Sequence, residues 1–162
     1  MRRTTVKWAC VAVALALSAT AAASTLIPHT LRQRAQASSR VAVVRVIGQR
    51  VETRDDGRPV KTVTDVEVLD GVKGSGAKRL AVVQVGGVAN GYTMRVPGDA
   101  RFEVGETCLV FLTCDDARCG LVALGEGKLA LRDGRVEVHD LFTQRWSTQP
   151  LEAVLRELRS AK

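Results

Sequence analysis

Residues 41–52 read VAVVRVIGQRVE, a run of β-branched side chains that one glycine, Gly48, interrupts. Runs rich in Val and Ile favour strands, and a lone Gly inside such a run is typical of a bulge or bend. Asp56-Gly57 then marks a turn, after which residues 60–69 form a second β-branched run. The sequence therefore predicts a long bent strand, a turn and a second strand.

Further strands are predicted at short intervals downstream, with glycine turns between them. They cover residues 80–85, 92–96, 108–114, 120–124, 128–131 and 136–139. Closely spaced strands of this kind indicate a closed or nearly closed antiparallel barrel. Helix formers over residues 30–37 predict a short helix before the barrel, and Pro150 opens a second helix with one apolar face. The predicted fold class is therefore mostly β, a small antiparallel OB-like barrel with a short N-terminal helix and a C-terminal helix.

The first 23 residues have the order of a secretion signal. Three basic residues without an acid precede an apolar run over residues 8–17, and small residues follow to position 24. Since a membrane-spanning helix needs roughly 20 apolar residues, the run is too short for stable insertion, and we expect cleavage after Ala23. The protein is thus expected in the periplasm or outside the cell, by the twin-arginine or the general secretory route. Retention of the segment as a membrane anchor is the alternative.

The chain divides into four predicted segments. These are a signal peptide over 1–23, a helical lead-in over 24–40, a β-barrel domain over 41–146 and a C-terminal helix over 147–162. Cleavage lowers the formal net charge from +7 to +4, because the signal carries three bases and no acid. So small a charge, with few aromatic side chains, argues against nucleic-acid binding, which uses a basic groove and stacking rings. We interpret Arg32, Arg34 and Arg40 as a solvated helix face.

Three cysteines remain after cleavage: Cys108, Cys114 and Cys119. In an oxidising compartment, two cysteines across a four-residue turn are read first as a disulfide, so we expect Cys114 and Cys119 to clip a hairpin. Cys108 alternates with Val110 and Leu112 on one strand face, which predicts a buried free thiol. A catalytic thiolate at Cys108 would require a basic neighbour and access to solvent.

No set of residues amounts to a catalytic site, so the sequence predicts neither an enzyme nor a bound cofactor or metal. Nucleophilic hydrolysis needs a base beside Ser or Cys, yet the only histidines are His29 and His139, and no G-x-S-x-G motif occurs. Metal binding stays open as an alternative, because Cys114, Cys119 and His139 have the chemistry of zinc ligands. The glycines of residues 86–91 have the spacing of a phosphate loop, but no lysine follows them.

A longer pattern carries a family resemblance. The letters LDGVKG end a predicted strand at residues 69–74, a Gly-Gly loop stands at 86–87, and GETCLVFL fills residues 105–112. In these positions the chain resembles a family of uncharacterised exported bacterial proteins, over about residues 39–131. The resemblance implies a small exported barrel and no particular activity.

A more distant likeness is to netrin-like and metalloprotease-inhibitor domains, which are OB-type barrels. The matching positions are Lys73-Gly74 and Gly105-Glu106. Those inhibitors reach the protease metal with an N-terminal cysteine, whereas this chain would begin at Ser24 after cleavage. The likeness therefore implies the barrel alone and not the inhibition.

Function is expected to reside in the glycine-rich loops, because recognition usually sits on loops that rigid strands hold in place. The candidate binding residues are Val88, Asn90, Tyr92, Asp99 and Arg101. The sequence thus predicts a non-enzymatic exported domain that binds another protein or a cell-envelope component, with the ligand and the oligomeric state left open. The alternative is an enzyme or metal-binding protein centred on Cys108, or on Cys114, Cys119 and His139.

Overall fold

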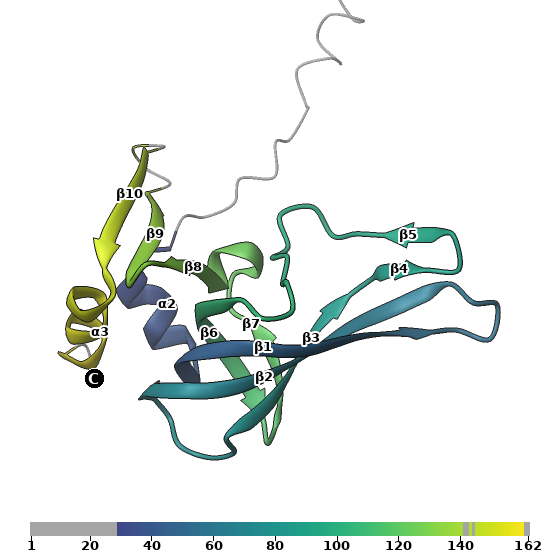
Figure 1. Cartoon of the computed structure of the whole chain (residues 1–162), viewed down its shortest axis with the longest axis horizontal. Helices are drawn as coiled ribbons and strands as arrows, with labels where there is room; N and C mark the ends of the chain where they lie inside the picture. Colours follow the sequence, from purple (N-terminus) through teal and green to yellow (C-terminus); the bar gives the residue numbers. More distant parts are fainter. Residues whose placement is uncertain (1–28, 141–142, 144, 161–162) are drawn as a thin grey trace, which may run out of the picture.

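A computed structural model describes residues 29–140, 143 and 145–160 (Figure 1). The predicted signal peptide, residues 1–23, lies outside the described residues, so its role as an export tag stays a prediction. Within the described part of the chain, no helix has both the length and the apolar character that crossing a membrane requires.

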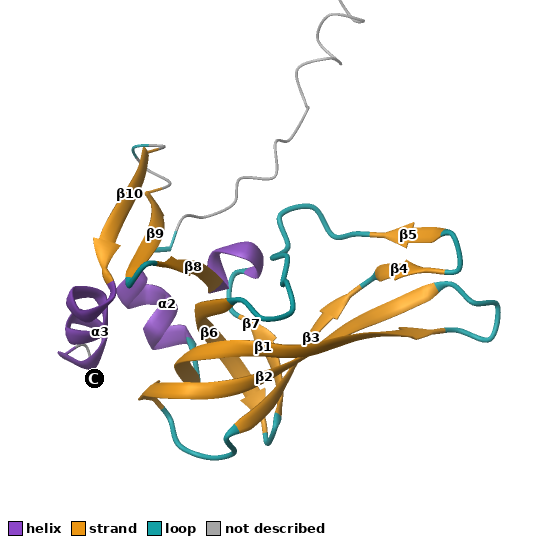
Figure 2. Ribbon diagram, viewed as in Figure 1, coloured by secondary structure: helices purple, strands orange, loops and turns teal. Residues whose placement is uncertain are grey.

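Five strands close into a barrel (Figure 2). They are β1 (Arg40–Thr53), β2 (Pro59–Lys73), β3 (Arg79–Val85), β6 (Thr107–Asp115) and β7 (Arg118–Leu121). Strand β1 pairs antiparallel with both β2 and β6, and β7 lies between β6 and β3. The small OB-like barrel expected from the sequence is thereby confirmed.

One pair in the ring, β3 with β7, is parallel rather than antiparallel. A closed ring of antiparallel neighbours needs an even number of strands, because direction alternates at every step. With five strands, one neighbouring pair must therefore run the same way. Here β1, β3 and β7 share one direction, so the parallel pair falls where β7 closes onto β3.

The predicted bend in the first strand is present. The pairing of β1 with β2 shifts register between Val46 and Gly48, which leaves Ile47 as the bulged residue. The turn that follows is closed by a bond from the Arg54 amide to the Arg58 carbonyl. This long, twisted β1–β2 hairpin projects beyond the barrel (Figure 1).

The remaining elements flank the barrel. They are helix α2 (Leu31–Ala37), strands β4 (Gly87–Ala89) and β5 (Tyr92–Met94), the 3₁₀ turn η1 (Leu124–Gly127), strands β8 (Lys128–Arg132), β9 (Arg135–Asp140) and β10 (Arg145–Pro150), and helix α3 (Leu151–Ser160). Strand β8 pairs with β6 and continues through β9 to β10, which extends the sheet away from the ring. Strands β4 and β10 were not anticipated, and the C-terminal helix begins only after β10.

Two apolar cores share strand β1. Its residues alternate, so Ala42, Val44 and Val46 face the barrel interior, whereas Val41 and Val43 pack toward the helices. Helices α2 and α3 cover this outer face (Figure 2). Burial on both faces explains why the run that begins at Val41 is apolar almost throughout rather than alternating.

The interpretation of Arg34 and Arg40 as solvated residues is wrong. Only Arg32 is exposed, because Arg34 lies on the barrel-facing side of α2 with 3% exposure. Arg40 belongs to β1, where alternation turns it inward, and it is 7% exposed with its Nη2 donating to the Ala77 carbonyl at 2.8 Å. Both side chains are therefore buried and hydrogen-bonded rather than solvated.

Candidate functional site

A groove of about 600 Å³ lies between the barrel and residues 86–103, the segment that connects β3 to the approach of β6. We call it the hairpin groove, because the β4–β5 hairpin forms part of its wall. Strands β1, β2 and β3 supply its floor, through Gln49, Val51, Thr62 and Gln84. The loop after β5, which contains the predicted residues Asp99 and Arg101, completes the opposite wall.

Hydrogen bonds hold residues 86–103 over the barrel. At the start of the segment, the Gly86 amide donates to the Val60 carbonyl at 2.8 Å, and Thr62 Oγ1 donates to the Gly86 carbonyl at 2.8 Å. Further along, Gln84 Nε2 donates to the Ala100 carbonyl at 2.8 Å. Because both ends of the wall are tied to strands, the groove has a defined shape rather than that of a loose loop.

Glycine is required where the segment leaves β3. At Gly86 the backbone φ is +91°, and a Cβ would collide with the Met94 carbonyl oxygen. Only a residue without a side chain allows the two arms of the hairpin to approach so closely. The close packing of the groove wall therefore explains the glycine at position 86 of the Gly-Gly loop.

The tip of the β4–β5 hairpin rests on the β1–β2 turn, as Figure 1 shows. Asn90 Nδ2 donates to the Gly57 carbonyl at 3.1 Å, and the Arg58 guanidinium lies 5.5 Å from the centre of the Tyr92 ring. Two of the predicted binding residues, Asn90 and Tyr92, thus join the two hairpins to each other.

A second clasp fixes the far end of the segment. Lys128 Nζ on β8 lies 2.5 Å from Glu106 Oε1, donates to the Arg101 carbonyl, and sits 4.9 Å from the centre of the Phe102 ring. Phe102 itself is buried in the barrel core. The loop after β5 is therefore anchored by the buried Phe102 side chain and by the Lys128–Glu106 ion pair, which is largely shielded from water.

Exposed apolar side chains gather around the hairpin groove. Val85, Val88 and Met94 line it and are 57%, 55% and 47% exposed. Exposed apolar patches on small proteins are often functional. Of the predicted loop residues, Val88 is part of this surface, whereas Val85 and Met94 were missed because they fall within the predicted strands 80–85 and 92–96 rather than in a loop.

Strand β3 is only partly covered along its second edge. It pairs with β7 at Ala81 and Val82, but residues 83–85 have β2 on one side and no strand of the described structure on the other. A second cavity of about 610 Å³ opens here, lined among others by Val83, Gly120 and Arg118. We call it the seam cavity, because it lies where the barrel closes.

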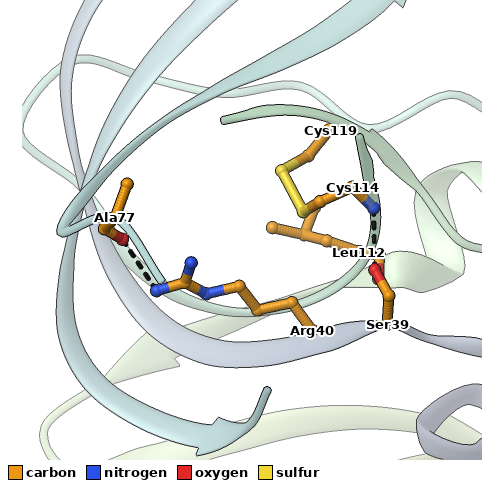
Figure 3. Close-up of a disulfide and its surroundings, with 6 residues drawn as sticks. All are labelled: Ser39, Arg40, Ala77, Leu112, Cys114 and Cys119. Carbon is orange, nitrogen blue, oxygen red and sulfur yellow. Dashed lines mark hydrogen bonds between the residues drawn. A yellow bond between two sulfur atoms is a disulfide. The ribbon is translucent and has the colours of Figure 1, made fainter. Parts of the chain in front are cut away.

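The predicted disulfide between Cys114 and Cys119 is confirmed (Figure 3). The two cysteines face each other directly across β6 and β7, and both line the seam cavity. The Cys114 amide donates to Ser39 Oγ at 2.8 Å, which ties this end of the hairpin to the start of β1. Because both sulfurs are bonded to each other, neither is a free zinc ligand.

Cys108 does not have the surroundings of a nucleophile. Its side chain is 0% exposed in the barrel core, as the alternation on its strand predicts. Burial raises the pKa of this thiol to about 12, so it stays protonated at neutral pH. The side chain of His139 lies outside the described part, within which no three His, Cys, Asp or Glu side chains cluster as metal ligands would.

Comparison with models of protein families and with curated proteins finds no match for this chain, so the resemblance to exported barrel proteins stays a prediction.

Proposed function

We propose that this protein is an exported, non-enzymatic binding domain that holds an extended segment of another polypeptide in the hairpin groove. The observation that carries the proposal is the set of exposed apolar side chains, Val85, Val88 and Met94, beside an uncovered stretch of β3. The unpaired edge of β3 lies between the hairpin groove, which Val85 lines, and the seam cavity, which Val83 lines. An extended peptide is recognised by backbone pairing along such an edge and by side-chain pockets beside it.

The uncovered stretch of β3 sets the size of the bound segment. Residues 83–85 span about 10 Å at the usual rise of a strand, enough for a few paired residues of the ligand. Side chains of a strand alternate, so every second ligand residue would face the apolar wall at Val85. We therefore expect a short segment with apolar residues at alternate positions.

The rim of the groove favours an acidic residue in the ligand. The side chains of Arg95 and Arg101 are exposed there, and neither has a carboxylate partner among the described residues. Asp99 is less available, because its Oδ1 accepts a bond from the Ala100 amide. A carboxylate beside the apolar positions of the ligand would gain charge-assisted bonds to these arginines.

Export is the second part of the proposal. It is supported by the signal-like order of residues 1–23 and by the disulfide, since such bonds persist in oxidising compartments. Expression of the full chain in a bacterial host, followed by N-terminal sequencing of the periplasmic product, is expected to give a protein beginning at Ser24. An uncleaved chain in the cytoplasm would contradict this part.

Peptide binding is tested with a phage-displayed library of random linear peptides panned against the mature protein. We expect enrichment of short sequences with alternating apolar residues, whose binding shifts the NMR signals of the Val83 and Val85 amides. Val88→Asp should weaken such a peptide at least about tenfold, because it places a charge on the apolar wall. Leu69→Asp is the matched control, since Leu69 is 46% exposed against 55% for Val88 but lies on β2 outside the groove. If no sequence is enriched, or if Val88→Asp binds as the parent does, the proposal fails.

A further inference from the structure

We propose that the Cys114–Cys119 disulfide is a thiol–disulfide exchange site, which a dithiol reductant opens through the seam cavity to release β7 from β3. The released edge of β3 would lengthen the peptide-binding edge, and this last step rests on the proposed function. The inference follows from the position of the bond in the ring of strands.

Closure of the barrel depends on β7, which is the shortest strand of the ring. Along β3 it pairs at Ala81 and Val82, and the Ala81 amide donates to the Ala117 carbonyl at 2.9 Å. Along β6 it is held by an antiparallel ladder that includes the disulfide. The disulfide is therefore a covalent link between β7 and β6 in addition to the peptide chain.

A reductant would have to approach this bond through the half-buried Cys114, because Cys119 is 3% exposed and belongs to the barrel core. The seam cavity is open, and both cysteines line it, although Cys119 is buried and Cys114 is the more exposed of the two. The charges that line the same cavity balance, since Lys61 and Arg118 stand beside Glu52 and Asp115, and Arg118 Nη2 lies 3.7 Å from Glu52 Oε1.

The exchange balances with a dithiol as the co-reactant. Its thiolate attacks Sγ of Cys114, forming a mixed disulfide, and the electron pair of the broken bond leaves on Cys119 as a thiolate that takes up a proton. The second thiol of the reductant then attacks the reductant's own sulfur in the mixed disulfide. This releases the Cys114 thiol and leaves the reductant as a disulfide, so two electrons and two protons have passed to the protein.

The consequence is local, because the disulfide closes a very short loop. Such a loop restricts the unfolded chain little, so reduction removes little global stability. Reduction does remove a constraint on the position of β7. Its pairing with β3 is the shortest pairing between neighbouring strands of the ring. The open edge of β3 then grows from residues 83–85 to residues 81–85.

Hydrogen exchange of the mature protein, before and after treatment with dithiothreitol, tests the exchange site without any ligand. We expect the Ala81 amide to exchange at least about tenfold faster after reduction. The Val68 amide, which donates to the Lys78 carbonyl elsewhere in the barrel, is the internal control and should not change. The double variant Cys114→Ser, Cys119→Ser should behave as the reduced protein without dithiothreitol. A Cys108→Ala variant keeps the disulfide and should respond as the parent does.

Three results would overturn the exchange site. The first is a disulfide that dithiothreitol reduces only when the protein is unfolded, and the second is an Ala81 amide whose exchange does not change on reduction. Equal acceleration of the Ala81 and Val68 amides would also overturn it, because that pattern is global unfolding.

The link to binding has its own readout. Affinity for a peptide selected against the groove should rise in the double variant, because more of β3 is available for pairing. Seam opening without a change in affinity overturns the link and leaves the exchange site standing. Failure of the parent to bind any peptide overturns the proposed function instead, and the exchange rates are unaffected by it.

Discussion

Lys128 Nζ and Glu106 Oε1 form an ion pair of 2.5 Å that joins strand β8 to the start of β6 beneath the groove wall. The side chains are 11% and 23% exposed, so removal of one partner leaves the other charge poorly solvated. We expect Lys128→Met to destabilise the fold by about 2 kcal/mol, measured by urea unfolding. The double variant Lys128→Met, Glu106→Gln should recover part of that loss, and a double variant as unstable as the sum of the singles would contradict the pairing.

Separate replacement of Gly86 and Gly91 distinguishes backbone strain from steric clash. Gly86 and Gly91 both have positive φ, but a Cβ at Gly86 would strike the Met94 carbonyl while one at Gly91 would meet open space. Gly91→Ala is therefore expected to cost only the conformational strain, about 1 kcal/mol, and Gly86→Ala about 2 kcal/mol more. Thermal unfolding gives the comparison. Equal losses would mean that the hairpin arms are not in close contact.

Arg34 and Arg32 lie on the same helix, α2, but only Arg34 is buried, so their alanine variants can be compared directly. Arg34 donates to the His29 and Glu126 carbonyls at 3.1 and 2.6 Å, and its guanidinium lies 5.7 Å from the centre of the Phe111 ring. Arg34→Ala should cost about 2–3 kcal/mol in unfolding free energy, because two part-buried carbonyls lose a donor and the buried guanidinium leaves a gap. Arg32→Ala, on the solvent side of the same helix, should change stability by less than about 0.5 kcal/mol. Similar values for the two variants would contradict the placement of α2.

Ionisation of the buried Cys108 thiol is expected to lower the free energy of unfolding at alkaline pH. Its pKa rises from the ordinary 9.0 to about 12 in the fold, because burial disfavours the thiolate, while Lys128 opposes and Glu106 reinforces the rise. A group with a raised folded pKa contributes its stability in full below the unfolded pKa and loses it as pH rises through the folded one. Stability should therefore fall between about pH 9 and 12 more steeply in the parent than in Cys108→Ala, as urea unfolding at several pH values will show. Parallel slopes would show that Cys108 ionises as freely in the fold as in the unfolded chain.

Several elements could be predicted from local pattern alone. The β-branched run around Gly48 gave a bent strand, alternation placed Cys108 inside, and Cys114 and Cys119 formed their bond. Each of these depends on neighbours within a few residues, through propensity, period-2 alternation or a short loop. Strands β4 and β10 escaped prediction, because the first is glycine-rich and the second, RWSTQP, is polar and ends in Pro150.

The groove could be predicted only in part. Val88, Asp99 and Arg101 were assigned to loops and do line it, but Asn90 and Tyr92 instead join the two hairpins. No local signal shows that a hairpin folds back over β1 and β2, since the bond between Thr62 and the Gly86 carbonyl joins residues that are distant in sequence.

What the sequence by itself determined is most of the strands, the inward face of β6 and the disulfide. What only the tertiary structure decided is which strands close the ring, where the open edge of β3 lies, and that Arg34 and Arg40 are buried. The physical reason is that periodicity assigns a side chain to a face, whereas pairing between distant strands decides what that face meets.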